Sequence, residues 1–118
     1  MDGEISASEL QSLLKSDEQV TIIDIRSPSE FKQAHIPEST NIPFAELTTQ
    51  IEEFETSDHI VTVCPHGKAS IQAARLIASY EGFDGRVESL ADGIEGWSYE
   101  IHSHQTSVST DTDSSAPF

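Results

Sequence analysis

The sequence predicts an α/β domain with a central, largely parallel sheet and helices on both of its faces. Short runs of β-branched apolar residues, typical of buried strands, alternate along the chain with amphipathic segments that carry helix start signals. Parallel strands need crossover connections, and right-handed helical crossovers cover both faces of the sheet. The 118 residues are enough for one such domain with a modest core.

The first elements are a short extended stretch, a helix and a strand. After the extended stretch at Ile5, Ser6 and Glu9 form an S-x-x-E capping box, which predicts a helix over Ser6–Lys15. The run Val20–Ile25 is apolar on both faces, as expected for a central strand that helices cover.

A second helix start signal follows directly. Ser27 stands at the N-cap, Pro28 at the first helical position and Glu30 at the third. We therefore expect a short helix from Pro28 to about Ala34. Residues 35–43 contain two prolines and show no periodicity, which predicts a loop.

The middle of the chain continues the alternation. Apolar residues at three- and four-residue spacing predict an amphipathic helix over Phe44–Phe54. Ile60–Val63 is a second short buried strand, and residues 65–69 form a turn. Ser70 is the expected N-cap of a helix that ends near Gly82. The residues of this helix expected to face the core are Ile71, Ala74, Ile77 and Ala78.

The last elements complete the domain. Val87–Leu90 is the final expected strand, and the turn over residues 91–95 leads into a short helix over residues 96–101. Beyond that helix Ser, Thr and Asp dominate, and such a segment cannot bury enough apolar surface to offset its ordering entropy. We therefore expect one domain over residues 1–101 and a disordered acidic tail over residues 102–118.

The chain is strongly acidic, with a formal net charge of −15 from six Lys and Arg against 21 Asp and Glu. Such a surface repels nucleic acid and anionic lipid, so neither is an expected partner. Two explanations stay open: a halophilic adaptation, which the low lysine content favours, and the ordinary acidity of a small cytosolic protein. Apolar runs fall short of the roughly 20 residues that cross a bilayer, and the acidic N-terminus does not resemble a signal peptide. A cytoplasmic location is the resulting expectation.

Cys64 is the single cysteine of the chain. It cannot form an internal disulfide, nor supply a structural zinc site built from four cysteines or from paired cysteines and histidines. We predict no metal site. The thiol is either an inert buried group or a catalytic nucleophile.

The residues around Cys64 favour the nucleophile. A strand, a tight turn and a helix aim backbone N–H groups and the positive helix end at the centre of the turn, which lowers the pKa of a thiol there. Gly67 permits a positive φ and close approach to a ligand, and Lys68 adds a positive charge. His66 either adds a hydrogen bond or faces solvent.

Three separated segments fit one known pattern. The first is D-I-R-S-P-S-E-F over Asp24–Phe31, followed by His35–Pro37 and Asn41–Pro43. The second is the C-x-x-G-x-x loop that begins at Cys64. The third is L-A-D-G-I-E-G-W over Leu90–Trp97. Together they resemble the rhodanese family of sulfurtransferases.

The resemblance implies a three-layer rhodanese-like fold, with helices on both faces of a central parallel five-stranded sheet. It also implies ping-pong sulfur transfer. Cys64 takes sulfur from thiosulfate or a persulfide and passes it to cyanide, a thiol or a protein acceptor, without a cofactor. The substrate-binding residues that it implies are Pro65, His66, Gly67, Lys68, Ala69 and Ser70, with Arg26 as a further candidate.

Several positions depart from the family pattern. Ala34 and Glu38 replace two loop glycines. Ser39 replaces an alanine, and Asp92 replaces a glycine of the third segment. Ala69 stands where family members often carry Arg, Thr or Ser, which removes a group that would hold an anionic donor.

Four further residues have expected supporting roles. Asp24 and Arg26 have two possible roles. In the one that we favour, the two side chains pair and hold the strand end and the first loop in place; in the other, Arg26 contacts the substrate. Glu30 is expected to serve as the third residue of its helix, and Trp97 as a core anchor.

Two other functions compete with sulfur transfer. A phosphatase or arsenate reductase on the same fold would carry Arg six residues after the cysteine, where this chain has Ser70. A non-catalytic rhodanese-like binding or sulfur-relay module usually lacks the cysteine, which is present here as Cys64.

Overall fold

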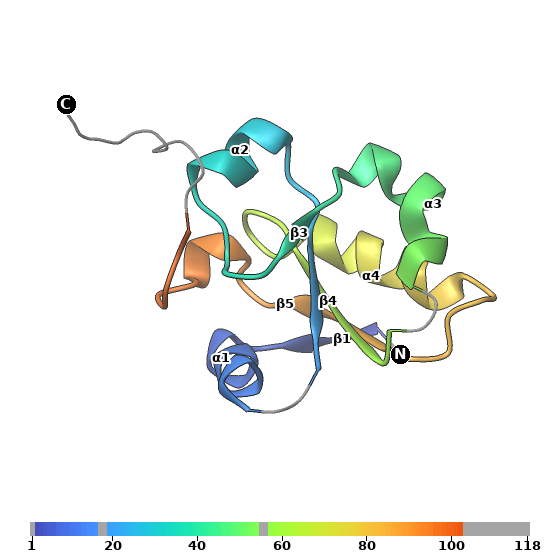
Figure 1. Cartoon of the computed structure of the whole chain (residues 1–118), viewed down its shortest axis with the longest axis horizontal. Helices are drawn as coiled ribbons and strands as arrows, with labels where there is room; N and C mark the ends of the chain where they lie inside the picture. Colours follow the sequence, from blue (N-terminus) through green and yellow to red (C-terminus); the bar gives the residue numbers. More distant parts are fainter. Residues whose placement is uncertain (1, 17–18, 55–56, 103–118) are drawn as a thin grey trace.

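Five parallel strands form one sheet at the centre of the molecule. The computed structural model describes residues 2–16, 19–54 and 57–102. The strands are β1 (Asp2–Ile5), β2 (Thr21–Asp24), β3 (Thr40–Asn41), β4 (His59–Val63) and β5 (Arg86–Leu90). They lie in the order β1-β5-β4-β2-β3, and all neighbouring pairs are parallel (Figure 1). The predicted parallel α/β architecture is confirmed.

Helices flank this sheet on both sides, which gives three layers (Figure 1). The α-helices are α1 (Ala7–Lys15), α2 (Pro28–Gln33), α3 (Leu47–Gln50) and α4 (Ala69–Ser79). Short 3-10 turns are η1 (Phe44–Glu46), η2 (Ile51–Phe54) and η3 (Ile94–Gly96). Both predicted capping boxes form, Ser6 with Glu9 before α1 and Ser27 with Glu30 before α2, and these boxes fix where the two helices begin.

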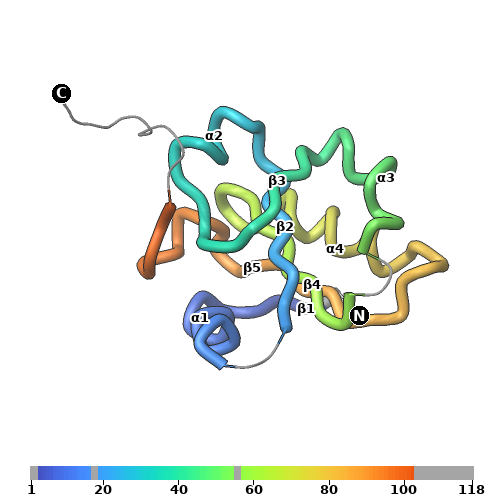
Figure 2. The backbone as a smooth tube through the Cα atoms, in the orientation of Figure 1, coloured from blue at the N-terminus to red at the C-terminus, as the bar shows by residue number. Residues whose placement is uncertain are grey.

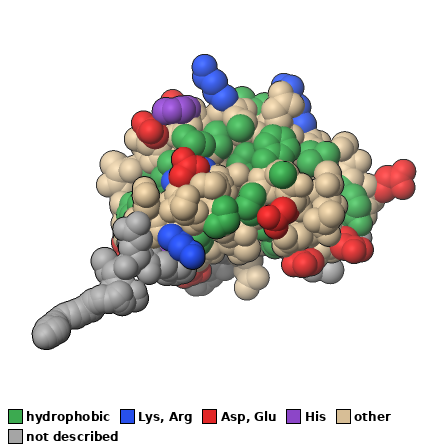
Figure 3. Space-filling model, turned by 90° about the horizontal axis from the view of Figure 1, so that it is seen from above, with side chains coloured by type: hydrophobic (Ala, Val, Ile, Leu, Met, Phe, Trp, Pro, Cys, Tyr) green, Lys and Arg blue, Asp and Glu red, His purple; other side chains and the backbone are tan. Residues whose placement is uncertain are grey.

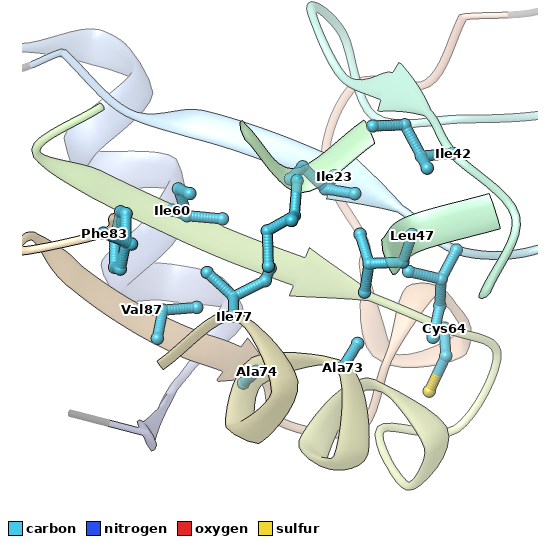
Figure 4. Packing of buried hydrophobic residues seen from close by; sticks show 12 residues of the cluster. Ile23, Ile42, Leu47, Ile60, Cys64, Ala73, Ala74, Ile77, Phe83 and Val87 are labelled. Atoms are coloured by element: carbon cyan, nitrogen blue, oxygen red, sulfur yellow. The ribbon is translucent and has the colours of Figure 1, made fainter. Parts of the chain in front are cut away.

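Each face of the sheet buries its own hydrophobic cluster. On one face α1 contributes Leu10, which packs with Ile22, Val61, Leu90 and Trp97. On the other face α3 and α4 contribute Leu47, Ala73, Ala74 and Ile77, which pack against Ile23, Ile60 and Val87 (Figure 4). Neighbours such as Ile22 and Ile23 enter opposite clusters because successive strand residues point to opposite faces.

The predicted loop over residues 35–43 contains a strand that the sequence prediction lacked. This strand, β3, pairs with the end of β2. The side-chain amide of Asn41 donates to the backbone carbonyls of Asp24 and Arg26 at 3.0 Å each. Two residues carry no periodicity, so β3 is defined by its partner strand and by the Asn41 amide.

The expected single helix over Phe44–Phe54 is wrong in detail, because α3 occupies only its middle and 3-10 turns occupy its ends. Thr49 Oγ1 donates to the carbonyl oxygen of Glu46 at 2.8 Å, a local bond that competes with the regular helix ladder. Leu47 and Ile51 nevertheless face the core, as their spacing predicted.

Ser70 lies inside α4, and its prediction as the N-cap is wrong. The N-cap is Lys68, whose side chain makes no capping hydrogen bond. The Ser70 hydroxyl instead bonds to buried side chains, which leaves it unavailable for the helix end. The buried residues of α4 are Ser70, Ala73, Ala74 and Ile77. Ile71 and Ala78 are half-buried, and the helix ends at Ser79, earlier than expected.

The predicted helix over residues 96–101 does not form. The 3-10 turn η3 ends at Gly96, and Trp97 has an extended backbone with φ −87° and ψ 114°. Glycine disfavours helix, and the Trp97 side chain is buried in the cluster on the α1 face. The chain therefore turns into the core where a helix was expected.

The predicted tail over residues 102–118 begins at the limit of the described structure. His102 pairs with His35 through two backbone hydrogen bonds, of 2.8 and 2.9 Å. Residues 103–118 lie outside the described residues, and the tail stays a prediction. Among the residues described, no helix has the length and apolar character of a membrane span.

Candidate active site

Cys64 follows β4 directly, at the carboxyl end of a strand inside the sheet. Open parallel sheets place ligand sites at this edge. Cys64 is 2% exposed and lies at one end of the cluster between the sheet, α3 and α4. Figure 4 shows its sulfur directed toward the loop that leads into α4. The strand thus delivers the thiol to the end of a long helix.

Hydrogen-bonding groups of this loop and of the first turn of α4 surround the sulfur. The backbone N–H of Gly67 donates to Cys64 Sγ at 3.1 Å, and Ser70 Oγ lies 3.3 Å from Sγ. The backbone N–H groups of His66 and Ser70 also stabilise an anionic sulfur. With the positive end of the 11-residue α4, these groups form a cradle for negative charge.

The cradle sets the pKa of the Cys64 thiol. Burial raises this pKa, but hydrogen bonds from the Ser70 hydroxyl and from the N–H groups of Ser70, Gly67 and His66 outweigh it. The pKa of Cys64 therefore lies below its ordinary value, and more of the thiol is ionised at neutral pH. Hydrogen bonds produce this lowering, whereas the sequence had pointed also to the charge of Lys68.

A second loop, which runs from the end of β5 into η3, holds the Cys64 loop in place. The backbone N–H of Ile94 donates to the carbonyl oxygen of Cys64 at 2.9 Å, and that of Glu95 donates to Pro65 at 3.1 Å. Because these carbonyls face the second loop, the N–H groups of the next two residues, His66 and Gly67, are available to the sulfur. Figure 2 shows the two segments side by side, the Cys64 loop in yellow-green and the second loop in orange.

Two glycines allow the loops to approach each other this closely. Gly67 has a φ of +84°, and a Cβ there would lie 2.7 Å from the backbone nitrogen of Asp92. Gly93 has φ 62° and ψ −163°, a backbone conformation essentially restricted to glycine. A Cβ on Gly93 would lie 2.5 Å from the carbonyl oxygen of Pro65. Both positions therefore require glycine.

The remaining side chains of the loop lie at its outer rim. His66, Lys68 and Ala69 are exposed, and Pro65 is half-buried. His66 Nδ1 lies 3.9 Å from a carboxylate oxygen of Glu95, which is also exposed. Seen from the side on which α2 and α3 lie, hydrophobic side chains gather near the middle, and charged side chains lie both among them and along the edge (Figure 3).

Asp24 and Arg26 form a buried ion pair beside β2. The Arg26 guanidinium donates to both carboxylate oxygens of Asp24, at 2.8 to 3.2 Å, and to the carbonyl oxygen of Ala34 at 2.6 Å. The side chains of Arg26 and Asp24 are 8% and 1% exposed. This arrangement is the one expected of the structural interpretation, in which the pair ties the strand end to the loop after α2.

Glu30 and Trp97 serve local structure. Glu30 completes the capping box of α2, and Trp97 is buried with its Nε1 donating to the carbonyl oxygen of Glu100 at 2.9 Å. Within the described residues, no group of three or more His, Cys, Asp or Glu side chains could hold a metal ion.

Ser89 and Gly93 belong to the site but are not among the site residues predicted from the sequence. Ser89 Oγ lies 2.6 Å from Ser70 Oγ, beneath the cysteine. The two-residue period of β5 could have identified Ser89, because Ser89 lies on the same face of the strand as Val87, which packs against α4. Gly93 is contained in the third motif, but its contact with the Cys64 loop depends on the tertiary fold.

Comparison with known proteins identifies close sequence relatives. A family model described as "Rhodanese-like domain" matches residues 6–100. The chain is 32% identical over 97 residues to a sulfurtransferase from Allochromatium vinosum, covering 82% of this chain and 89% of that protein. It is 34% identical over 93 residues to the thiosulfate sulfurtransferase GlpE from Pseudoalteromonas translucida, covering 79% and 86%. The chain also matches the putative sulfur carrier protein YrkF from Bacillus subtilis at 33% identity, but spans only 50% of its length.

Solved structures show the same fold. A rhodanese-related protein from Thermoplasma volcanium superimposes with a TM-score of 0.74 at 26% identity, over 85% of this chain and 97% of that one. A rhodanese-like domain protein from Staphylococcus aureus gives a TM-score of 0.76 at 22% identity, over 86% and 97%. The fold of this chain therefore extends over nearly the whole of both solved chains.

Proposed function

The chain belongs to the rhodanese-like domain family, and on that basis we propose that it is a sulfurtransferase that carries sulfur on Cys64. The observation that supports this most directly is the cradle around Cys64 Sγ, in which Gly67 N–H and the Ser70 hydroxyl stabilise an anionic sulfur. The chain has one cysteine, so no resolving thiol competes for the sulfur within the molecule. A lone, stabilised thiolate suits a carrier of one sulfur atom.

The proposed reaction has two displacement steps. In the first, the Cys64 thiolate attacks the outer sulfur of a donor, and the donor's sulfur–sulfur bond breaks with its electron pair leaving on the donor. Cys64 then holds a persulfide whose outer sulfur is anionic. In the second, cyanide or a thiolate attacks that outer sulfur, and the electron pair of the broken bond returns to Cys64. The backbone N–H groups stabilise the negative charge in both states.

The rim of the site favours a persulfide donor over thiosulfate. Ala69 offers no side chain to hold a sulfonate group, and the guanidinium of Arg26 is engaged by Asp24 and Ala34. The net charge of −15 also repels a dianion. The reacting group of a persulfide carries one negative charge, compared with two on thiosulfate, and it has no sulfonate to be held, so we propose this class as the donor and a thiol or a protein as the acceptor.

Intact-mass measurement tests the proposed function. The protein is incubated with thiosulfate or with glutathione persulfide. We expect a mass increase of one sulfur atom that dithiothreitol removes, and we expect a larger fraction of the protein to carry this sulfur after incubation with the persulfide. The Cys64→Ser variant is the control and should gain no sulfur. If neither donor adds sulfur to the wild-type chain, the proposal is wrong and the binding module becomes the better explanation.

The phosphatase alternative has a separate test. Ser70 stands at the position where such an enzyme needs an arginine, and its hydroxyl is bonded to Cys64 and Ser89. We therefore expect no release of phosphate from an aryl phosphate beyond the rate of the Cys64→Ser variant. A faster release that depends on Cys64 would support that alternative.

A further inference from the structure

A buried chain of hydroxyl groups lies beneath Cys64. Sγ is 3.3 Å from Ser70 Oγ, and Ser70 Oγ is 2.6 Å from Ser89 Oγ. Ser70 is 0% exposed and Ser89 is 1% exposed, so solvent does not compete for these bonds. The proposed function accounts for the first link of this chain but gives no role to Ser89.

Two adjacent strands anchor the first turn of α4 through hydroxyl groups. Thr62 of β4 and Ser89 of β5 are register partners. Thr62 Oγ1 donates to the backbone carbonyl of Ser70 at 2.7 Å, whereas Ser89 bonds to the Ser70 side chain. Thr62 therefore holds the backbone of the helix, and Ser89 is the group that controls where the Ser70 hydroxyl points.

The direction of the hydroxyl bonds depends on the charge of the sulfur. A hydroxyl group has one proton to donate, so Ser70 donates either to Ser89 or to Cys64 Sγ. When Cys64 is a thiol, its S–H can donate to Ser70, which then donates to Ser89. When the sulfur is anionic, Ser89 donates to Ser70 and Ser70 donates to the sulfur. Each serine keeps its own proton throughout and only rotates.

We propose that Ser89 is a positioning residue for sulfur transfer, whose hydroxyl turns the Ser70 hydroxyl toward Cys64 Sγ when that sulfur is anionic. This inference deepens the proposed function and rests on it for the step that it serves. A donor bond from Ser89 polarises the Ser70 hydroxyl and strengthens its own bond to the thiolate. Without Ser89, the Ser70 hydroxyl loses both the polarisation and the constraint on its rotation.

The ionisable groups around the cradle are separate from this hydroxyl chain. The exposed ones are His66 and Lys68 in the loop, Asp92 and Glu95 in the second loop, and Arg75 in α4. Asp24 and Arg26 bond to each other, and α3 contains no ionisable residue. Glu88 of β5 points to the opposite face of the sheet from Ser89, where it accepts a bond from His59 at 2.8 Å. A neutral substitution at Ser89 therefore leaves the charges around Cys64 unchanged.

The test is the pH dependence of Cys64 alkylation by iodoacetamide, followed by intact mass on the full chain. For Ser89→Ala we expect the midpoint of the profile to rise and the rate at neutral pH to fall about three- to tenfold, the effect of losing about one hydrogen bond between neutral groups, here that of Ser89 to Ser70. Ser89→Thr retains the hydroxyl and should restore most of the rate. Thr62→Val is the matched control, because it removes a neighbouring buried hydroxyl that bonds to the Ser70 backbone.

The outcomes separate this inference from its alternatives. An unchanged profile in folded Ser89→Ala overturns it, and so does an equal rise of the midpoint in Thr62→Val, which would make helix packing the cause. If circular dichroism shows that Ser89→Ala is unfolded, the isosteric pair Ser89→Thr and Ser89→Val gives the same comparison. Alkylation needs no sulfur donor, so a failure of sulfur loading alone would reject the proposed function, while the alkylation profile would still decide whether Ser89 orients the Ser70 hydroxyl toward Cys64.

Discussion

Gly93 packs directly against the backbone carbonyl of Cys64, so closely that a Cβ on Gly93 would overlap its oxygen. The next residue, Ile94, donates its N–H to the same carbonyl at 2.9 Å. The orientation of the Cys64 loop therefore depends on a segment that follows a different strand. This contact links the third sequence motif to the nucleophile.

A Gly93→Ala substitution tests the contact. The backbone conformation is closed to alanine, and the new methyl group would meet the carbonyl oxygens of Cys64 and Pro65. We expect the free energy of unfolding to fall by about 2–4 kcal/mol from strain and overpacking, measured by urea denaturation, together with slower alkylation of Cys64. Gly3→Ala is the control, because a Cβ on Gly3 meets nothing within 4 Å. Equal stability of the two variants would show that the loops separate without cost.

Glu38 and Asp92 hold left-handed backbone conformations, with φ of 68° and 66°, at two positions where the family pattern has glycine. Glu38→Gly should raise the free energy of unfolding by about 0.5–1 kcal/mol, because glycine adopts this conformation without a Cβ clash. Asp92→Gly should gain less, since aspartate tolerates the left-handed region better. Glu52→Gly, in the 3-10 turn η2, should lower stability instead. A loss of stability in Glu38→Gly would contradict the expectation.

Much of the fold is encoded locally and was predictable for that reason. The capping boxes at Ser6 and Ser27 involve residues three positions apart, and β4 contains a run of β-branched residues from Ile60 to Val63 that are all buried. The strand β3 has no such local signal, because only its pairing with β2 defines it. Ser70 carries a misleading signal, since a serine before an amphipathic stretch is typical of an N-cap while here its hydroxyl serves the core.

The candidate site likewise contains residues that the local sequence predicts and residues that only the tertiary fold brings in. Cys64 and Gly67 lie within one short loop between a strand and a helix, and this local order predicts a thiolate cradle with a lowered pKa. Ser89 and Gly93 reach the site from the next strand and its loop. Their roles need the order of the strands and the approach of two loops, which no local pattern contains.

Cys64 makes the stability of the protein depend on pH. The folded-state pKa of its thiol is lowered, whereas an unfolded chain gives about 8.5. Between these two values the unfolded state binds more protons, so the free energy of unfolding rises with pH. The contribution is complete above the unfolded pKa and is lost as pH falls through the folded pKa.

This dependence is measured as the difference in unfolding free energy between the wild type and Cys64→Ser. Urea denaturation at about pH 6 to about pH 9 should show that difference growing with pH, because serine does not ionise in this range. Other titrating groups are common to both proteins and cancel. A difference that stays flat or shrinks would mean that the folded state does not favour the thiolate.

The net charge of −15 predicts a response to salt. Screening reduces repulsion among the carboxylates, so the melting temperature should rise by several degrees between low salt and about 2 M KCl if the acidity is a halophilic adaptation. Glycerol at equal viscosity serves as the uncharged control. A melting temperature that KCl leaves unchanged would favour ordinary acidity, and the cytoplasmic location stays a prediction in either case.

Substitutions at the Asp24–Arg26 pair distinguish a structural role of Arg26 from a role in binding substrate. Arg26→Gln leaves the Asp24 carboxylate, which is 1% exposed, without its bidentate partner, and the free energy of unfolding should fall by about 3–5 kcal/mol. The double variant Asp24→Asn/Arg26→Gln should lose less than the sum of the single variants, because it leaves no unpaired buried charge. Donor titrations complete the comparison: with a structural role, the folded double variant retains the wild-type KM for a persulfide. A KM that rises tenfold or more in the stable double variant would instead place Arg26 on the substrate.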